Sequence, residues 1–209
     1  MPFDLFGIFK VRIIAETDKI VTVRYPTDDE WVRRVRATKT FRKSLGRKRA
    51  EFTPSSTGAF DAELFKKIRS DASIDLDEFE STHVIDRLDR TEVLSTEREG
   101  RVYVSTFKTF GGSIVSHSLR IPTEKAVRKY YDQSGKTTFE ARNSEIRSYL
   151  EPSGPFYDEH FESATGYVIP ENKTLLECVP INHKSVIISE MLMTIQEASQ
   201  EDADIDPNL

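Results

Sequence analysis

The chain reads Ile20-Val21-Thr22-Val23-Arg24-Tyr25-Pro26-Thr27 directly before a charged segment that extends from Asp28 to Arg36. The β-branched residues favour a strand, and Pro26 keeps the residue before it extended. Thr27 can accept a hydrogen bond from a backbone N–H one turn further on, and Glu30 is spaced to complete a capping box. The stretch therefore predicts a strand that leads directly into a helix.

A second step of the same kind occurs near the middle of the chain. It reads Ile114-Val115-Ser116-His117-Ser118-Leu119-Arg120-Ile121-Pro122-Thr123 and precedes the segment from Glu124 to Tyr131. One interpretation is an internal duplication, since self-similarity at this level indicates a repeated unit. The other is a chance recurrence of a common signal for a helix start. Both predict one sheet-then-helices unit in each half.

Working outward from the first step, alternating and β-branched residues predict a hairpin formed by residues 11–15 and 19–25. Apolar residues at helical spacing then predict helices that begin near residue 28 and that cover residues 60–69 and 76–88. A polar segment over residues 51–58 predicts a loop between the first two helices. The first half is therefore expected to be a β-hairpin followed by helices.

The second half begins with a predicted three-stranded antiparallel meander, whose strands cover residues 92–96, 101–109 and 113–121. Helices are expected to follow over residues 124–133, 138–150, 156–164 and from about residue 186 onward. The sequence thus predicts an α+β protein with two sheet-then-helices units, residues 1–90 and 91–196. Residues 197–209 are acidic and poor in apolar side chains, which predicts a mobile tail.

Bulk properties exclude several classes of protein. No window of the chain approaches the roughly 18 consecutive apolar residues of a membrane helix, so no membrane association is expected. The N-terminus lacks the features of a signal peptide, and the single cysteine, Cys178, permits no internal disulfide. A cytoplasmic protein is therefore the expectation.

The sharpest local feature is a basic run over residues 33–49, in which nine of seventeen residues are Lys or Arg and none is acidic. This run carries +9, so the rest of the chain carries −14 against a total of −5. Such a cluster can neutralise nucleic-acid phosphates, dock on an acidic protein surface, or form a solvated helix face. Its basic residues are Arg33, Arg34, Arg36, Lys39, Arg42, Lys43, Arg47, Lys48 and Arg49.

No catalytic, metal or cofactor motif is present. The four histidines are scattered, and no His-x-x-x-His, Cys-x-x-Cys, Gly-rich phosphate loop or nucleophile elbow occurs. We therefore expect a non-enzymatic protein without a cofactor. An apolar stripe on the last helix can serve either as a groove for a protein partner or as core packing, and its residues are Ile187, Ile188, Met191, Leu192 and Ile195.

The second half resembles phage and prophage tail-assembly chaperones. The resemblance lies in Val102-Tyr103-Val104, Gly111-Gly112 and His117-Ser118-Leu119-Arg120-Ile121-Pro122-Thr123, with further similarity over residues 156–167 and 179–184. It covers about half of the chain and carries over no catalytic residue. It implies a helper of tail assembly that binds tape-measure or tail-tube proteins in a bacterial or phage-infected cell. The alternative is a nucleic-acid-binding accessory protein that acts through residues 33–49. The stoichiometry stays open.

Overall fold

The computed structural model describes residues 1–13, 19–44, 58–123 and 149–203, with side chains except at 39–44 and 194–203. Contacts between residues divide the chain into two compact units. Unit 1 comprises Met1–Phe3, Thr91–Lys108 and Ser113–Leu209, and unit 2 comprises Asp4–Arg90 and Thr109–Gly112.

Unit 2 contains the predicted hairpin, formed by β1 (Ile8–Arg12) and β2 (Ile20–Arg24) in antiparallel register. The first strand begins earlier than expected, because the alternation that buries Val11 extends back through Phe9 to Ile8. Val21 and Val23 of β2 are also buried, so one face of the hairpin contributes to the core of this unit.

Three helices complete unit 2: α1 (Asp28–Ser44), α2 (Gly58–Ile68) and α3 (Glu78–Asp89), which confirm the three helices expected there. The buried residues of α2 and α3 share one apolar core, namely Leu64, Phe65, Ile68, Val84, Ile85 and Leu88. At the start of α2, a Cβ on Gly58 would lie 2.7 Å from Cβ of Glu78, so only glycine permits this approach. The loop expected over residues 51–58 lies outside the described residues except for Gly58.

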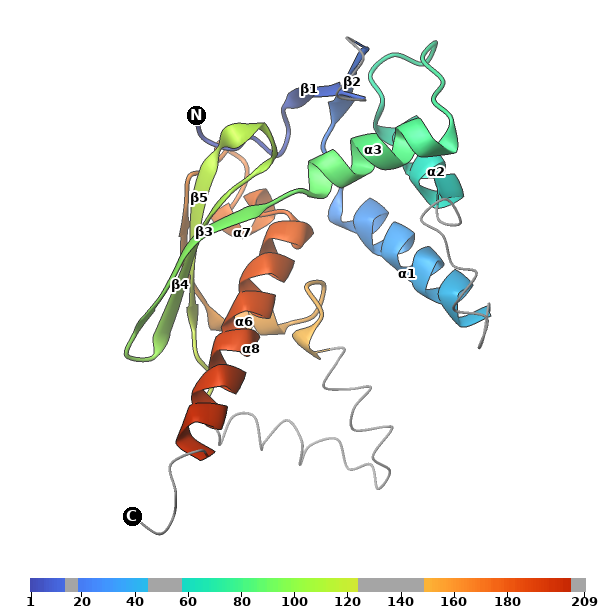
Figure 1. Ribbon diagram of the computed structural model, residues 1–209. Helices are drawn as coiled ribbons and strands as arrows, with labels where there is room; N and C mark the ends of the chain where they lie inside the picture. The colour runs from blue at the N-terminus through green and yellow to red at the C-terminus, as the bar shows by residue number, and fades with distance from the viewer. Residues whose placement is uncertain (14–18, 45–57, 124–148, 204–209) are drawn as a thin grey trace. The chain divides into compact units, whose positions relative to one another are not determined.

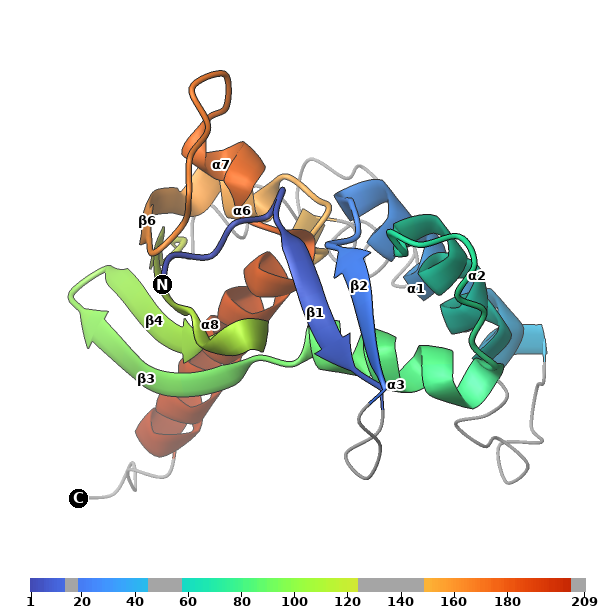
Figure 2. The same ribbon diagram turned by 90° about the horizontal axis from the view of Figure 1, so that it is seen from above.

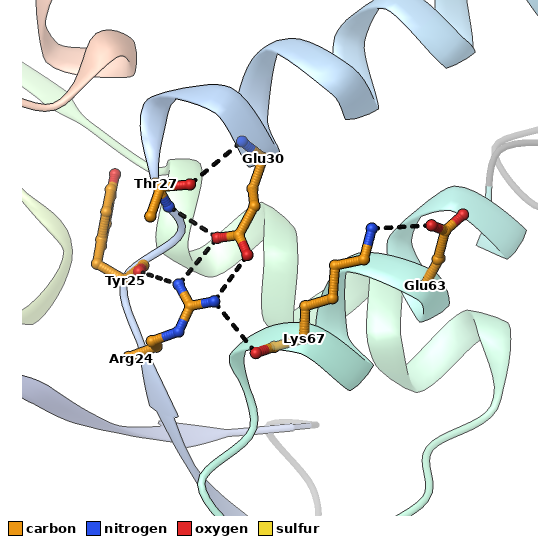
Figure 3. Close-up of polar contacts among 6 residues, drawn as sticks. All are labelled: Arg24, Tyr25, Thr27, Glu30, Glu63 and Lys67. Carbon is orange, nitrogen blue, oxygen red and sulfur yellow. Dashed lines mark hydrogen bonds and ion pairs between the residues drawn. The ribbon is translucent and has the colours of Figure 1, made fainter.

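The expected capping box is confirmed at the β2–α1 junction (Figure 3). Thr27 N donates to Glu30 Oε2 over 2.9 Å, and Glu30 N donates to Thr27 Oγ1 over 3.3 Å. Arg24 adds a two-pronged pair to the same carboxylate, at 2.7 and 2.8 Å, and also donates to the carbonyl of Lys67. The hydrogen bond from Arg24 is the main reason that the pKa of Glu30 is lowered to about 2. The strand, the helix start and α2 are thus fixed by one charged cluster.

Unit 1 is built on a four-stranded antiparallel sheet in the order β3-β4-β5-β6 (Figures 1 and 2). The strands are β3 (Glu92–Glu99), β4 (Val102–Lys108), β5 (Ile114–Arg120) and β6 (Phe161–Thr165). Between β4 and β5 in the sequence, the chain forms the short helical turn η3 (Phe110–Gly112), which belongs to unit 2. The predicted meander is confirmed as β3, β4 and β5. The α+β class is confirmed as well.

The fourth strand corrects the helix expected over residues 156–164. Only α6 (Phe156–His160) is helical, and the chain becomes extended at Phe161 and pairs with β5. The free edge of β5 gains a ladder of backbone hydrogen bonds, which outweighs the local preference of this short segment for helix. Gly166 ends the strand with a φ of 87°, and a Cβ there would lie 2.3 Å from the carbonyl oxygen of Ile114.

The first residues of the chain cover the β6 end of this sheet. Phe3 N donates to the carbonyl of Gly166 over 2.7 Å, and Val168 N donates to the carbonyl of Phe3 over 2.9 Å. The Phe3 ring is buried and lies 4.8 Å from the ring of His183, centroid to centroid. The N-terminus thus extends the pairing beyond β6, whereas nothing in the described structure pairs beyond β3.

Two further helices belong to unit 1, α7 (Leu175–Cys178) and α8 (Ile181–Ala203). α8 contacts β4 and α6 contacts β5, so both lie against the sheet (Figure 1). α8 continues as far as Ala203, within the segment where a tail is expected from residue 197, through strong helix formers such as Glu, Ala and Gln. The helices expected over 124–133 and 138–150 fall almost entirely outside the described residues, as do residues 204–209.

Candidate functional site

The basic run, which can bind nucleic acid, dock on an acidic protein surface or form a solvated helix face, is only partly within the described structure. Arg33 and Arg36 are exposed on α1. Lys39, Arg42 and Lys43 belong to the helix, but their side chains lie outside the described residues, as does all of Arg47, Lys48 and Arg49.

Arg34 departs from the rest of this run because it is held inside unit 2. Its Nε donates to Asp61 Oδ1 over 2.5 Å, and its guanidinium lies 5.5 Å from the ring centroid of Trp31. Asp61 is only 1% exposed and also accepts from Thr82 Oγ1 over 3.0 Å. A buried carboxylate of this kind requires its cation. Arg34 therefore joins α1, α2 and α3 rather than facing a partner.

The apolar stripe of α8 is packed into the protein's own core. Ile187, Ile188 and Met191 are buried and Leu192 is half-buried, while the side chain of Ile195 lies outside the described residues. Of the two interpretations that the sequence left open, core packing accounts for the three buried residues.

The covered face of the sheet, which carries Tyr103, Ser105 and Phe107 of β4, contains an unexpected polar row at its centre. His117 of β5 is 0% exposed and stands opposite Ser105 on one side and Ala164 of β6 on the other. Because both neighbours are small, the rings of larger residues can approach the imidazole from above the sheet.

A chain of hydrogen bonds, which we call the Tyr–His network, fills this space with four side chains. The Tyr157 hydroxyl, on α6, lies 2.9 Å from His117 Nδ1. The Tyr167 hydroxyl bonds His117 Nε2 and also lies 3.0 Å from Nδ1 of His183, on α8. One assignment of protons satisfies all three links with neutral histidines, if Tyr157 donates to His117, His117 to Tyr167 and Tyr167 to His183. The network thereby connects β5, α6, α8 and the segment after β6.

Burial fixes the protonation state of this network. Desolvation lowers the pKa of His117 to about 3, with a smaller contribution from the charge of Lys184, and lowers the pKa of His183 well below its usual value. Burial also raises the pKa of Tyr157. Lys184 itself lies 5.0 Å from the Tyr157 ring centroid and 3.4 Å from Asp158. With His183 only 1% exposed, these rings are placed to hold the fold rather than to meet a substrate.

The edge of the sheet on the side away from β6 is formed by β3, and it is open in the described structure. In the part of the chain that the structure describes, this strand pairs only with β4 (Figure 2), and all of its eight residues are exposed. The ladder has a bulge between Val93 and Ser95, which shifts the faces of the residues before and after it. An edge strand of this length offers a row of backbone N–H and C=O groups to another strand.

The sequence predicted neither the Tyr–His network nor the open edge of β3. A signal for the network existed, because Val115, His117 and Leu119 alternate along β5 and so place the histidine on the buried face. No signal marked the other members of the network, since Tyr157, Tyr167 and His183 come from segments far along the chain. The β3 strand was predicted, but its exposure depends on which strand forms the far edge of the sheet.

No family model, curated protein or solved structure matches the chain. Across the described residues, no three His, Cys, Asp or Glu side chains are grouped as a metal site. Within the same ranges, no helix combines the length and the apolar content that crossing a membrane requires.

Proposed function

We propose that this chain is a non-enzymatic protein-interaction and assembly factor, which binds an extended segment of its partner along the edge of β3. The exposed eight-residue edge is the observation that carries the proposal. A strand that adds to such an edge gains main-chain hydrogen bonds, while alternate side chains supply specificity. Val93 and Leu94 are exposed on the same strand and offer apolar surface to it.

The resemblance to phage tail-assembly chaperones gives the proposal a specific form. The residues that carry it in the middle of the chain, Val102 to Thr123, include β4 and β5 of the sheet whose edge is β3. In this form the partners are tape-measure or tail-tube proteins, and the complex assembles in the cytoplasm of a bacterial or phage-infected cell. The β3 edge takes the partner-binding role that was one of the two interpretations of the α8 stripe.

Co-expression with candidate tape-measure and tail-tube proteins tests this proposal. The tagged chain is expected to retain one of them through purification. Recovery of the chain alone, with both candidates expressed and soluble, would contradict the tail-assembly form of the proposal.

A matched pair of proline variants, Thr96→Pro and Glu97→Pro, tests the role of the edge itself. Neighbouring residues of an antiparallel strand point their N–H groups to opposite sides, so one proline removes a bond to β4 and the other removes a donor from the open edge. Thermal unfolding identifies the second variant, which keeps wild-type stability. That variant is expected to lose the partner, and undiminished capture by it would overturn the proposal.

The exposed Arg33 and Arg36 favour a second candidate function, in which the basic run binds nucleic acid. This function predicts retention on heparin that falls steeply with salt. Retention should also disappear in the triple variant Arg47→Ala, Lys48→Ala, Arg49→Ala. Wild-type protein that passes through heparin at low salt would rule it out.

A further inference from the structure

The register of β3 against β4 separates the charges of the edge strand by face. Glu97 pairs with Val104 and Glu99 with Val102, and these valines alternate with the buried Tyr103 and Ser105 of β4. Both glutamates therefore lie on the face of the sheet opposite to the covered face, here called the outer face.

The two glutamates have no cation opposite them on β4. Glu92, on the same face, stands opposite Lys108, but Glu97 and Glu99 stand opposite valines. Among the described residues, the ion pairs found include neither Glu97 nor Glu99. Two carboxylates at alternate positions thus lie on the outer face of the edge strand, beside the place that an added strand would occupy.

We infer that the partner segment is an extended strand with Lys or Arg at two alternate positions, which lie opposite Glu97 and Glu99. This inference rests on the proposed function, since it names the partner of the same edge. Opposite charges directly across a strand pair are favourable, and like charges are unfavourable. The outer face of the edge therefore selects a basic strand over a neutral or acidic one.

Arg98 restricts which residue of the partner strand can stand between those two cations. Arg98 pairs with Tyr103, so it lies on the side of the covered face. A partner residue between the two cations would lie beside Arg98, where a third cation would be repelled. The selected pattern is therefore basic, non-basic, basic, and a continuous run of Lys or Arg fits less well.

A second copy of this chain is a poor occupant of the same edge. Its β3 would bring its own Glu92, Glu97 and Glu99 to the outer face, with only Arg98 as a cation in the strand. Edge-to-edge pairing would therefore gather carboxylates along one face without cations to balance them. The charge of the strand favours a different chain as its occupant.

Two blocked peptides of identical composition test the inference. One has the sequence Thr-Val-Thr-Val-Lys-Val-Lys-Val-Thr, and the other places the two lysines side by side, so that they point to opposite faces. Binding to the full chain is followed by chemical shifts of the β3 amides. The alternating peptide is expected to bind roughly tenfold tighter, because it gains a second charge pair and avoids Arg98.

The double variant Glu97→Lys, Glu99→Lys reverses the charge at both positions. The matched control is Glu171→Lys, which lies in an exposed loop of the same unit. The double variant is expected to weaken the alternating peptide by about tenfold or more, whereas the control should bind as the wild type does. Equal affinity for both peptides, or an unchanged affinity in the double variant, would overturn the inference. The glutamates would then act only as a charge that keeps an open edge from aggregating.

The outcome is separable from that of the proposed function. If the double variant still captures a tape-measure or tail-tube partner, the partner is not a basic strand but the assembly function stands. If the alternating peptide binds and neither candidate partner is captured, the edge has the inferred selectivity and the tail-assembly function fails.

Discussion

The hydroxyl of Tyr167 lies 3.0 Å from Nδ1 of His183 and also bonds Nε2 of His117, so one oxygen joins two buried histidines. Both rings are neutral in the folded protein, because burial opposes the imidazolium form. The sheet and α8 are therefore held together by groups that protonate readily once they reach water.

This arrangement predicts a loss of stability in mild acid. The pKa of His117 falls to about 3 and that of His183 is also depressed, against about 6.5 in the unfolded chain. Stability is therefore full above pH 6.5 and is lost as the pH falls below it. His117 alone costs about 1.4 kcal/mol per pH unit below pH 6.5, or about 2.7 kcal/mol between pH 7.5 and 4.5, and His183 adds to this loss.

Amide hydrogen exchange of β4 and β5 across this pH range measures the effect, after correction for the intrinsic exchange rate. Glu30 contributes little to this slope, because its stabilisation is lost only as the pH falls from its ordinary pKa of 4.5 towards its folded pKa of about 2. A free energy of opening that stays constant from pH 7.5 to 5.0 would contradict the neutral, buried state of the two histidines.

Removing single hydroxyl groups should show how much each hydrogen bond of the Tyr–His network contributes to the free energy of unfolding. Tyr167→Phe breaks the bonds to both histidines and is expected to cost about 2–4 kcal/mol, whereas Tyr157→Phe breaks one and should cost about 1–2 kcal/mol. Ser105→Ala is the matched control, since Ser105 Oγ is buried without a hydrogen-bond partner in the described structure. It should be neutral or stabilising, and urea unfolding of the three variants measures the order. A Tyr167→Phe variant as stable as the wild type would argue against the network.

The basic run should divide into a structural arginine and exposed ones. Arg34→Ala leaves the buried Asp61 carboxylate without its cation and should cost about 3 kcal/mol in unit 2. Arg33→Ala, one residue away and exposed, should change stability by less than about 0.5 kcal/mol. Trp31 is the single tryptophan of the chain, so its fluorescence reports the unfolding of this unit. Equal effects of the two substitutions would contradict the assignment of Arg34.

The capping box at the start of α1 gives a smaller, local prediction. Thr27→Ala removes the acceptor for Glu30 N and should destabilise the helix start by about 1 kcal/mol, while Thr27→Ser should retain most of the stability. Trp31 fluorescence during denaturant unfolding measures both variants. Equal losses in the alanine and serine variants would show that the hydroxyl is not the stabilising group.

Local patterns in the sequence were sufficient for much of the fold. The strand, proline and cap at residues 20–30 predicted the junction that the structure shows, because each signal acts within a few residues. The meander was predicted for the same reason, since turns and alternation are local. The boundaries of the first hairpin strand were less accurate, because Phe9 could be assigned to either side of the strand start.

The remaining features depend on contacts between distant segments. β6 forms because β5 has a free edge, which the sequence around Phe161 does not reveal. Arg34 differs from Arg33 only through Asp61, which lies on another helix. The edge of β3 became a candidate surface only once β6 was found to occupy the other side of the sheet.

Hydrogen exchange of the purified complex between the chain and its captured partner tests the central claim most directly. The amides of Glu92–Glu99 that face away from β4 are expected to exchange quickly in the free chain and to become protected in the complex. Protection confined to other elements, with β3 exchanging as quickly as in the free chain, would contradict the claim that this edge is the binding surface.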